Sequence, residues 1–198
     1  MTLRTRCIVL SMAAVFCLSA PAYGQAYCAL RDPVSTIAQM IPEGESYRSH
    51  VRVVRKQHQE TLREVVDFTI MNGELGQHTL YVVYKDEERI GFVHTRTEKG
   101  RFGLNEITWA LDDELRVLSF QLQRCRDPAQ HQVDSKALDD LLSGRSASQL
   151  AEMLDSQGQL RADVMAFESD TSREYASSLV RSAVKTILIS RLVWTDLF

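Results

Sequence analysis

The sequence predicts an α+β fold in which a four-stranded antiparallel meander is covered by N-terminal and C-terminal helices. Between residues 78 and 122, apolar residues recur with a period of two, and short polar turns separate the runs. On both sides of this region, apolar residues recur at the helical period instead. Since a sheet with one apolar face needs a cover, we expect the flanking helices to pack against it.

Residues 1–24 have the pattern of a cleavable secretory signal. Arg4 and Arg6 precede a short apolar run, and the small residues Ala22 and Gly24 stand at the −3 and −1 positions of the expected cleavage site. The run is too short to span a bilayer comfortably, although an uncleaved leader would be a weak anchor. We expect cleavage, no stable transmembrane anchor, and an exported, periplasmic protein with a single domain at residues 25–198.

Removing the leader makes the chain more acidic. Arg4 and Arg6 are its only charged side chains, so the formal net charge goes from −3 to −5. A nucleic-acid-binding protein would carry a basic patch, so we expect no nucleic-acid partner. The 44% hydrophobic content is too high for a disordered chain.

The cysteine count also changes, because two of the four Cys lie in the leader. In an oxidising compartment the remaining pair, Cys28 and Cys125, is most simply explained as a disulfide. That bond would tie the start of the mature chain to its middle.

Two helices are expected before the sheet. Asp32-Pro33 is typical of a helix start, and the helix should run from Pro33 to about Met40 and end before Pro42. A polar connection follows. The next helix should cover Gln57–Phe68, because its apolar residues share one face.

The meander should begin near His78, where Leu80, Val82 and Tyr84 alternate with their neighbours. Ile90–Thr97 is the second strand. The third has Ile107, Trp109 and Leu111 on one face, and the fourth has Leu118, Phe120 and Leu122 on one face. Polar turns at 85–89, 99–101 and 112–114 connect the strands.

Three helices should follow the sheet, at Asp134–Leu142, Ser148–Leu154 and Ser172–Val193. The last carries a broad apolar stripe, which indicates packing against the sheet. Lys185 and Arg191 interrupt that stripe, which argues against a membrane span.

The sequence shows no independent catalytic site. It contains no metal-ligand spacing of His or Cys and no known hydrolase, phosphate-loop or dinucleotide motif. His94, inside a strand, is expected to be a half-buried, hydrogen-bonded residue. The acidic triplets at 86–88 and 112–114 are interpreted as solvated turn charges rather than a catalytic carboxylate pair.

The order of several short motifs resembles the FMN-binding domain family, which includes the flavin subunits of Rnf and Na+-translocating NADH:quinone reductase complexes. The matching segments are Ile41–Gly44, Gly91–Val93, Gly103–Asp112, Leu115–Leu122, Ser143–Ser146, Asp163–Thr171 and Ala176–Val180. The resemblance covers about Pro33–Ile189. It implies an electron carrier, with a redox partner, rather than an independent enzyme.

In that family, FMN is attached through its phosphate to the Thr of an S-G-A-T element that opens a long helix. The resemblance places Thr171 at the modified position, with Ser169 and Ser172 beside it. A helix N-terminus favours a phosphate there. Trp109 or Tyr175 would offer a stacking face if the flavin is bound noncovalently.

The residues themselves leave alternatives open. Thr171-Ser172-Arg173-Glu174 also has the pattern of a capping box, in which Thr171 caps the helix and Glu174 returns the bond. Glu168 and Asp170 flank the expected phosphate, and Trp109 would suit the core of the meander. A degenerate, flavin-free member of the same fold, acting as a noncatalytic interaction or assembly partner, is therefore the alternative hypothesis.

Overall fold

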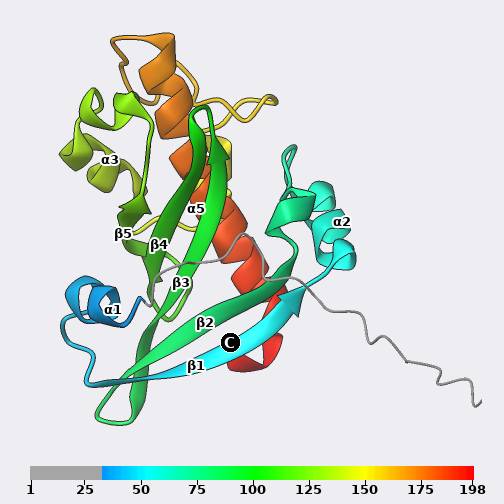
Figure 1. Ribbon diagram of the computed structural model, residues 1–198, viewed down its shortest axis with the longest axis vertical. Helices are drawn as coiled ribbons and strands as arrows, with labels where there is room; N and C mark the ends of the chain where they lie inside the picture. The colour runs from blue at the N-terminus through cyan, green and yellow to red at the C-terminus, as the bar shows by residue number, and fades with distance from the viewer. Residues whose placement is uncertain (1–32) are drawn as a thin grey trace, which may run out of the picture.

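The computed structural model describes residues 33–198, which form one antiparallel sheet with a long helix, α5, across one of its faces (Figure 1). The α+β class predicted from the sequence is confirmed. Five strands follow one another in the order of the chain: β1 Ser46–Val54, β2 Gly76–Lys85, β3 Glu88–Gly100, β4 Gly103–Leu111 and β5 Val117–Arg124.

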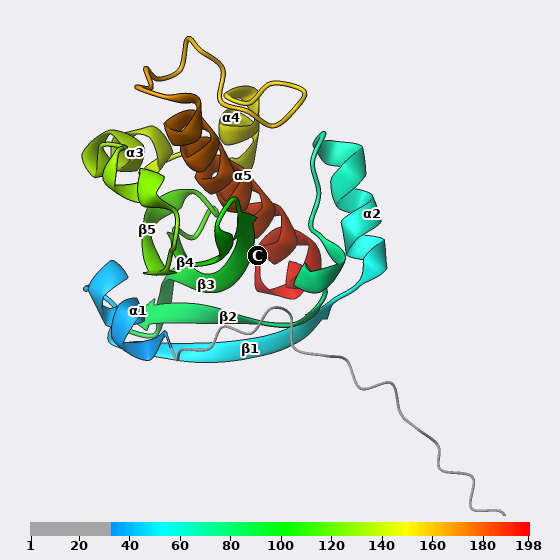
Figure 2. The same cartoon turned by 45° about the horizontal axis from the view of Figure 1, so that its top comes forward.

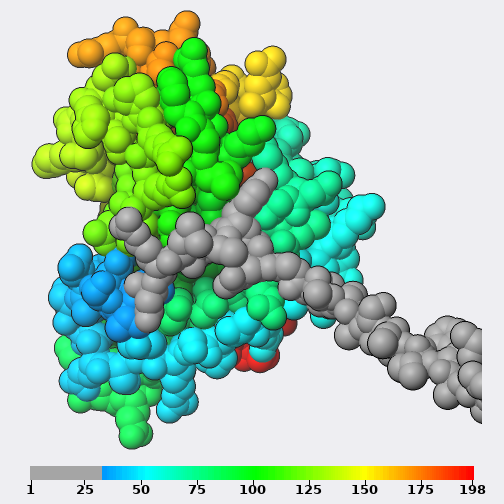
Figure 3. All heavy atoms as spheres, viewed as in Figure 1, coloured from blue at the N-terminus to red at the C-terminus, as the bar shows by residue number. Residues whose placement is uncertain are grey.

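The predicted number of strands is wrong by one, because the segment expected to be a polar connection forms β1. This strand pairs antiparallel with β2, with His50 opposite Leu80. As an edge strand it lies at the surface (Figure 3), and most of its side chains are exposed. A strand that buries little apolar surface needs no alternating apolar pattern, which is why the sequence did not indicate it.

Within residues 33–198, five α-helices surround the sheet. Both helices predicted before the sheet, at Pro33–Met40 and Gln57–Phe68, are present with bounds that differ by a few residues. The three helices predicted after the sheet are also present. Their bounds are α1 Val34–Met40, α2 Lys56–Val65, α3 Ser135–Leu142, α4 Ala147–Glu152 and α5 Asp170–Val193. The described part of the chain also contains three short 3-10 turns, η1 Asn72–Glu74, η2 Pro128–His131 and η3 Thr195–Leu197.

The two faces of the sheet have separate cores. On one face, α5 packs over β3 and β4 (Figure 2), and the fully buried Trp109 and Phe92 lie in this larger core with Leu179 and Ala183. On the opposite face, the short helix α1 packs against the sheet and forms a smaller apolar cluster with it. Its buried members are Ile37, Ile41, Val83, Val93 and Ala110.

Both acidic triplets lie at turns, as expected. Asp86 and Glu87 form the β2–β3 turn with φ of 48° and 65°. In the β4–β5 turn, Asp112 accepts hydrogen bonds from the backbone N–H groups of Glu114 and Arg116. Across residues 33–198, no helix is long and apolar enough to cross a membrane.

Candidate functional site

The start of α5 is fixed by Ser169 rather than by Thr171. Ser169 is the N-cap in an extended conformation, and its hydroxyl accepts the backbone N–H of Ser172 at 3.1 Å. The capping box expected at Thr171 and Glu174 is therefore wrong. The helix begins two residues earlier, so Thr171 already lies in its first turn, and Glu174 instead pairs with Arg181 at 2.9 Å.

The hydroxyl of Thr171 contacts a cation from the sheet. Arg101, in the β3–β4 turn, donates from Nη1 to Thr171 Oγ1 at 3.2 Å. Thr171 is partly exposed, so its hydroxyl lies near the surface. The fold thus brings a hairpin turn and a helix start together at this position, although they are 70 residues apart in the chain.

A hollow of about 370 Å³ lies beside this helix start. Its size falls within the usual range for small-molecule sites. Glu168 and Asp170 contribute negative charge to the lining, and Arg173 contributes positive charge. The lining residues are Ala162, Met165, Ala166, Phe167, Glu168, Ser169, Asp170 and Arg173.

The other residues predicted for a flavin site are buried. Ser172 is 2% exposed, and its hydroxyl donates to Gln132 Oε1 at 3.3 Å. Trp109 is 0% exposed in the core position considered for it, where its indole N–H donates to Ser182 Oγ. Tyr175 is 3% exposed. The structure therefore brings Ser169, Thr171 and Ser172 together but gives neither aromatic ring an exposed stacking face.

Cys125 lies just after β5, half-buried beside Tyr175. Burial raises the pKa of its thiol. Cys28 and the expected leader at 1–24 lie outside the described residues, so the disulfide and the cleavage stay predictions.

A second group of polar side chains, which was not predicted from the sequence, lies between the sheet and α5. We call it the buried cluster: Glu74 of η1, Arg96 and Glu98 of β3, and Lys185 of α5, each 2% or 3% exposed. Arg96 pairs with Glu74, and Lys185 Nζ lies 2.6 Å from Glu98 Oε1 and 3.6 Å from Glu74 Oε2. Two carboxylates and two cations make the cluster neutral in formal charge, as buried ions require.

Two histidines extend from this cluster toward the C-terminal half of α5. His78 Nε2 lies 2.8 Å from the Glu74 carbonyl oxygen, and His78 Nδ1 lies 3.2 Å from His94 Nε2. His94 Nδ1 in turn lies 3.0 Å from Ser190 Oγ. His94 is fully buried rather than half-buried as expected.

Burial shifts the pKa values of the acids and the bases in opposite directions here. It lowers the pKa of His78 to about 4 and that of His94 well below its ordinary value, with Arg96 adding to both shifts. Burial also raises the pKa of Glu98, against the opposing effect of Lys185. Both imidazoles are therefore neutral at pH 7, and the chain His78–His94–Ser190 is a hydrogen-bonded network without a charge of its own.

A serine hydrogen-bonded to a histidine is also the start of a nucleophilic site, but here the hydroxyl is enclosed. Ser190 and His94 are both 0% exposed, so a substrate has no contact with either. The arrangement joins α5 to β3 and η1. The sequence did contain a signal for the burial of these polar residues. His94, Arg96 and Glu98 lie on the same face of β3 as the buried Phe92, and Lys185 lies within the apolar stripe of α5.

Among residues 33–198, no three His, Cys, Asp or Glu side chains are grouped as a metal ion would need. No family model, curated protein or solved structure matches the chain.

Proposed function

We propose that this chain is an exported flavoprotein domain that carries FMN at the start of α5 and passes electrons to a periplasmic partner. The proposal rests on one observation. The Thr171 hydroxyl lies at a helix N-terminus, accepts a hydrogen bond from Arg101, and is next to a hollow of about 370 Å³. The resemblance of the sequence to FMN-binding domains gives the same threonine this role.

The phosphate end of FMN suits these residues. The N–H groups of the first helical turn and the helix dipole favour an anion, and Arg101 and Arg173 add positive charge. Glu168 and Asp170 oppose it. Because two cations balance two carboxylates, a phosphodiester on Thr171 is not in a uniformly negative environment.

The isoalloxazine ring needs an apolar surface, and Met165 and Phe167 in the hollow supply one. Trp109 and Tyr175 would then support α5 from inside the core rather than contact the ring. Bound FMN supplies the electron-transfer chemistry, whereas the protein supplies attachment, orientation and local charge.

The test is to co-express the chain with a flavin transferase and measure flavin absorbance and intact mass. We expect a mass increase of one FMN that Thr171→Ala abolishes and that Arg101→Ala reduces. Thr61→Ala, on α2, is the matched control and should load normally. A colourless, unmodified protein that also fails to bind added FMN would overturn the proposal.

The second candidate function is a flavin-free assembly partner on the same fold. Two observations favour it: Trp109 and Tyr175 have no exposed ring face, and Glu168 and Asp170 lie beside Thr171. The same loading experiment separates the candidates, since this one requires a colourless protein with an unmodified Thr171.

A further inference from the structure

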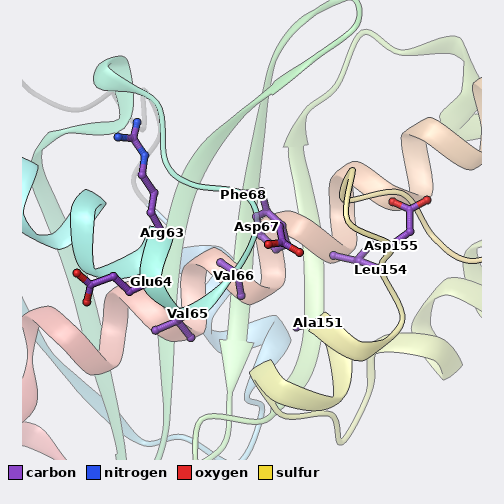
Figure 4. A pocket seen from close by; sticks show the side chains of 9 residues that line it. All are labelled: Arg63, Glu64, Val65, Val66, Asp67, Phe68, Ala151, Leu154 and Asp155. Atoms are coloured by element: carbon purple, nitrogen blue, oxygen red, sulfur yellow. The ribbon is translucent and has the colours of Figure 1, made fainter.

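A surface groove lies between α2 and α4, apart from the hollow beside Thr171. It consists of two adjoining hollows of about 200 and 360 Å³ that share Val65, Val66 and Ala151. Figure 4 shows Val65 and Val66 at the end of α2 on one side and Ala151 and Leu154 on the other. We call this feature the α2–α4 groove.

The floor of the groove is apolar. Its exposed apolar surface comes from Val65, which is 60% exposed, and from the partly buried Leu188 of α5. Leu115 and Ile187 also line it, but each is only 2% exposed. An exposed apolar surface in a concave site marks a place where another apolar group binds.

The rim of the groove is acidic. Five carboxylates and two guanidinium groups line the two hollows, and Glu64, Asp67 and Glu152 form no ion pair with any other residue among 33–198. The seven charged residues are Arg63, Glu64, Asp67, Glu114, Glu152, Asp155 and Arg191. The lining residues thus carry a formal charge of −3, which becomes −1 when Arg116, paired with Glu114, and Arg173, paired with Asp155, are included. Glu64, Asp67 and Glu152 remain as the carboxylates that a ligand can pair with.

We propose that the α2–α4 groove binds a short segment of a partner protein, with two or more large apolar side chains flanked by Lys or Arg. The apolar residues of that segment would cover Val65 and Leu188, and its cations would pair with Glu64 and Glu152. The proposal does not depend on flavin attachment, because none of these residues lines the hollow beside α5's start.

A second copy of the chain fits the groove poorly. A two-fold dimer places the same patch on both sides of the interface, so acidic rim would face acidic rim. The two hollows also accommodate only a few side chains, whereas a stable interface buries about 800 Å² on each partner. Both arguments favour a short basic segment.

The test is a selection of random twelve-residue peptides displayed on phage against the purified chain. The chain carrying Val65→Lys serves for counter-selection. We expect the recovered peptides to combine apolar residues with Lys or Arg. The best of them should bind Val65→Lys at least about tenfold more weakly, because that change removes apolar surface and repels a basic peptide.

The matched control is Val51→Lys on β1, since Val51 is 58% exposed and lies outside the groove. It should bind within about twofold of the unchanged chain. Similar thermal unfolding of the two lysine variants would show that neither effect comes from misfolding.

Charge reversal provides a second measurement. Glu152→Lys should weaken the selected peptide and strengthen a version in which Glu replaces its Lys and Arg residues. Three results would overturn the proposal: selected peptides without the apolar and basic pattern, equal loss of binding in Val51→Lys and Val65→Lys, or a dimer in sedimentation that only Val65→Lys dissociates.

Discussion

The first turn of α5 and its C-terminal half both contain polar residues, but the surroundings of these residues differ. At the first turn, Thr171 and Arg101 meet near the surface, where water is an alternative partner. Farther along, Lys185 and Ser190 are enclosed with Arg96 and Glu98 of β3. Exposed ion pairs contribute less than about 1 kcal/mol, whereas breaking a buried pair costs about 3–5 kcal/mol. Changes in the C-terminal half of α5 are therefore expected to cost more stability than changes at its start.

Lys185→Met should give the largest loss of stability. It leaves Glu98 buried without its 2.6 Å partner, and the free energy of unfolding should fall by about 3 kcal/mol. The loss is limited because Glu98 can take up a proton instead of staying charged. Chemical denaturation at pH 7 measures it.

The variant's pH dependence tests that explanation. Since the folded state of Lys185→Met would bind a proton on Glu98 that the unfolded chain lacks, its loss of stability relative to the unchanged chain should shrink as the pH falls from 7 toward 5. Adding Glu98→Gln should recover part of the loss at pH 7. If the double variant is as unstable as the single one, the ion pair is not the cause.

Lowering the pH should give the next largest loss of stability. The unfolded chain protonates His78 near pH 6.5, but the folded chain does so only near pH 4. Stability should therefore fall as the pH drops through this window, by roughly 3 kcal/mol for His78, with His94 acting in the same direction. Denaturation at a series of pH values measures the slope.

His78→Gln isolates this contribution, because Glu98 has a raised pKa and acts in the opposite direction. The variant should show a smaller loss between pH 6.5 and 4 than the unchanged chain. Identical slopes would mean that His78 is already accessible to protons in the folded state.

The smallest expected effect distinguishes the two hydroxyl residues at the start of α5. Ser169→Ala removes the N-cap and should lower stability by about 1 kcal/mol. Thr171→Ala should change it by less than about 0.5 kcal/mol, because Thr171 does not cap the helix. Thermal unfolding of both variants gives the comparison. A larger loss of stability in Thr171→Ala than in Ser169→Ala would show that Thr171 caps the helix, as expected from the sequence.

Strong periodic patterns made most of the fold predictable. The strands around Leu80 and Trp109 and the long helix through Leu179 each carry enough apolar residues to reveal both type and face. In β5 the strand was predicted, but a register shift buries Val117 and leaves Leu118, expected on the apolar face, 41% exposed. The polar edge strand β1 was missed because exposed side chains leave no periodic signal. Ser169 was missed as the cap because a capping pattern two residues later fitted equally well.

The sequence by itself determined the fold class, the four strands β2 to β5 and the amphipathic character of α5, because local periodicity and turn residues specify these features. Only the tertiary structure decided which polar residues are buried. Glu74, Arg96, Glu98 and Lys185 come from three elements up to 111 positions apart, and the local patterns of β3 and α5 do not say which opposite charge each one meets. Burial depends on what packs against a residue, so neutralisation of these charges became visible only when the elements were assembled.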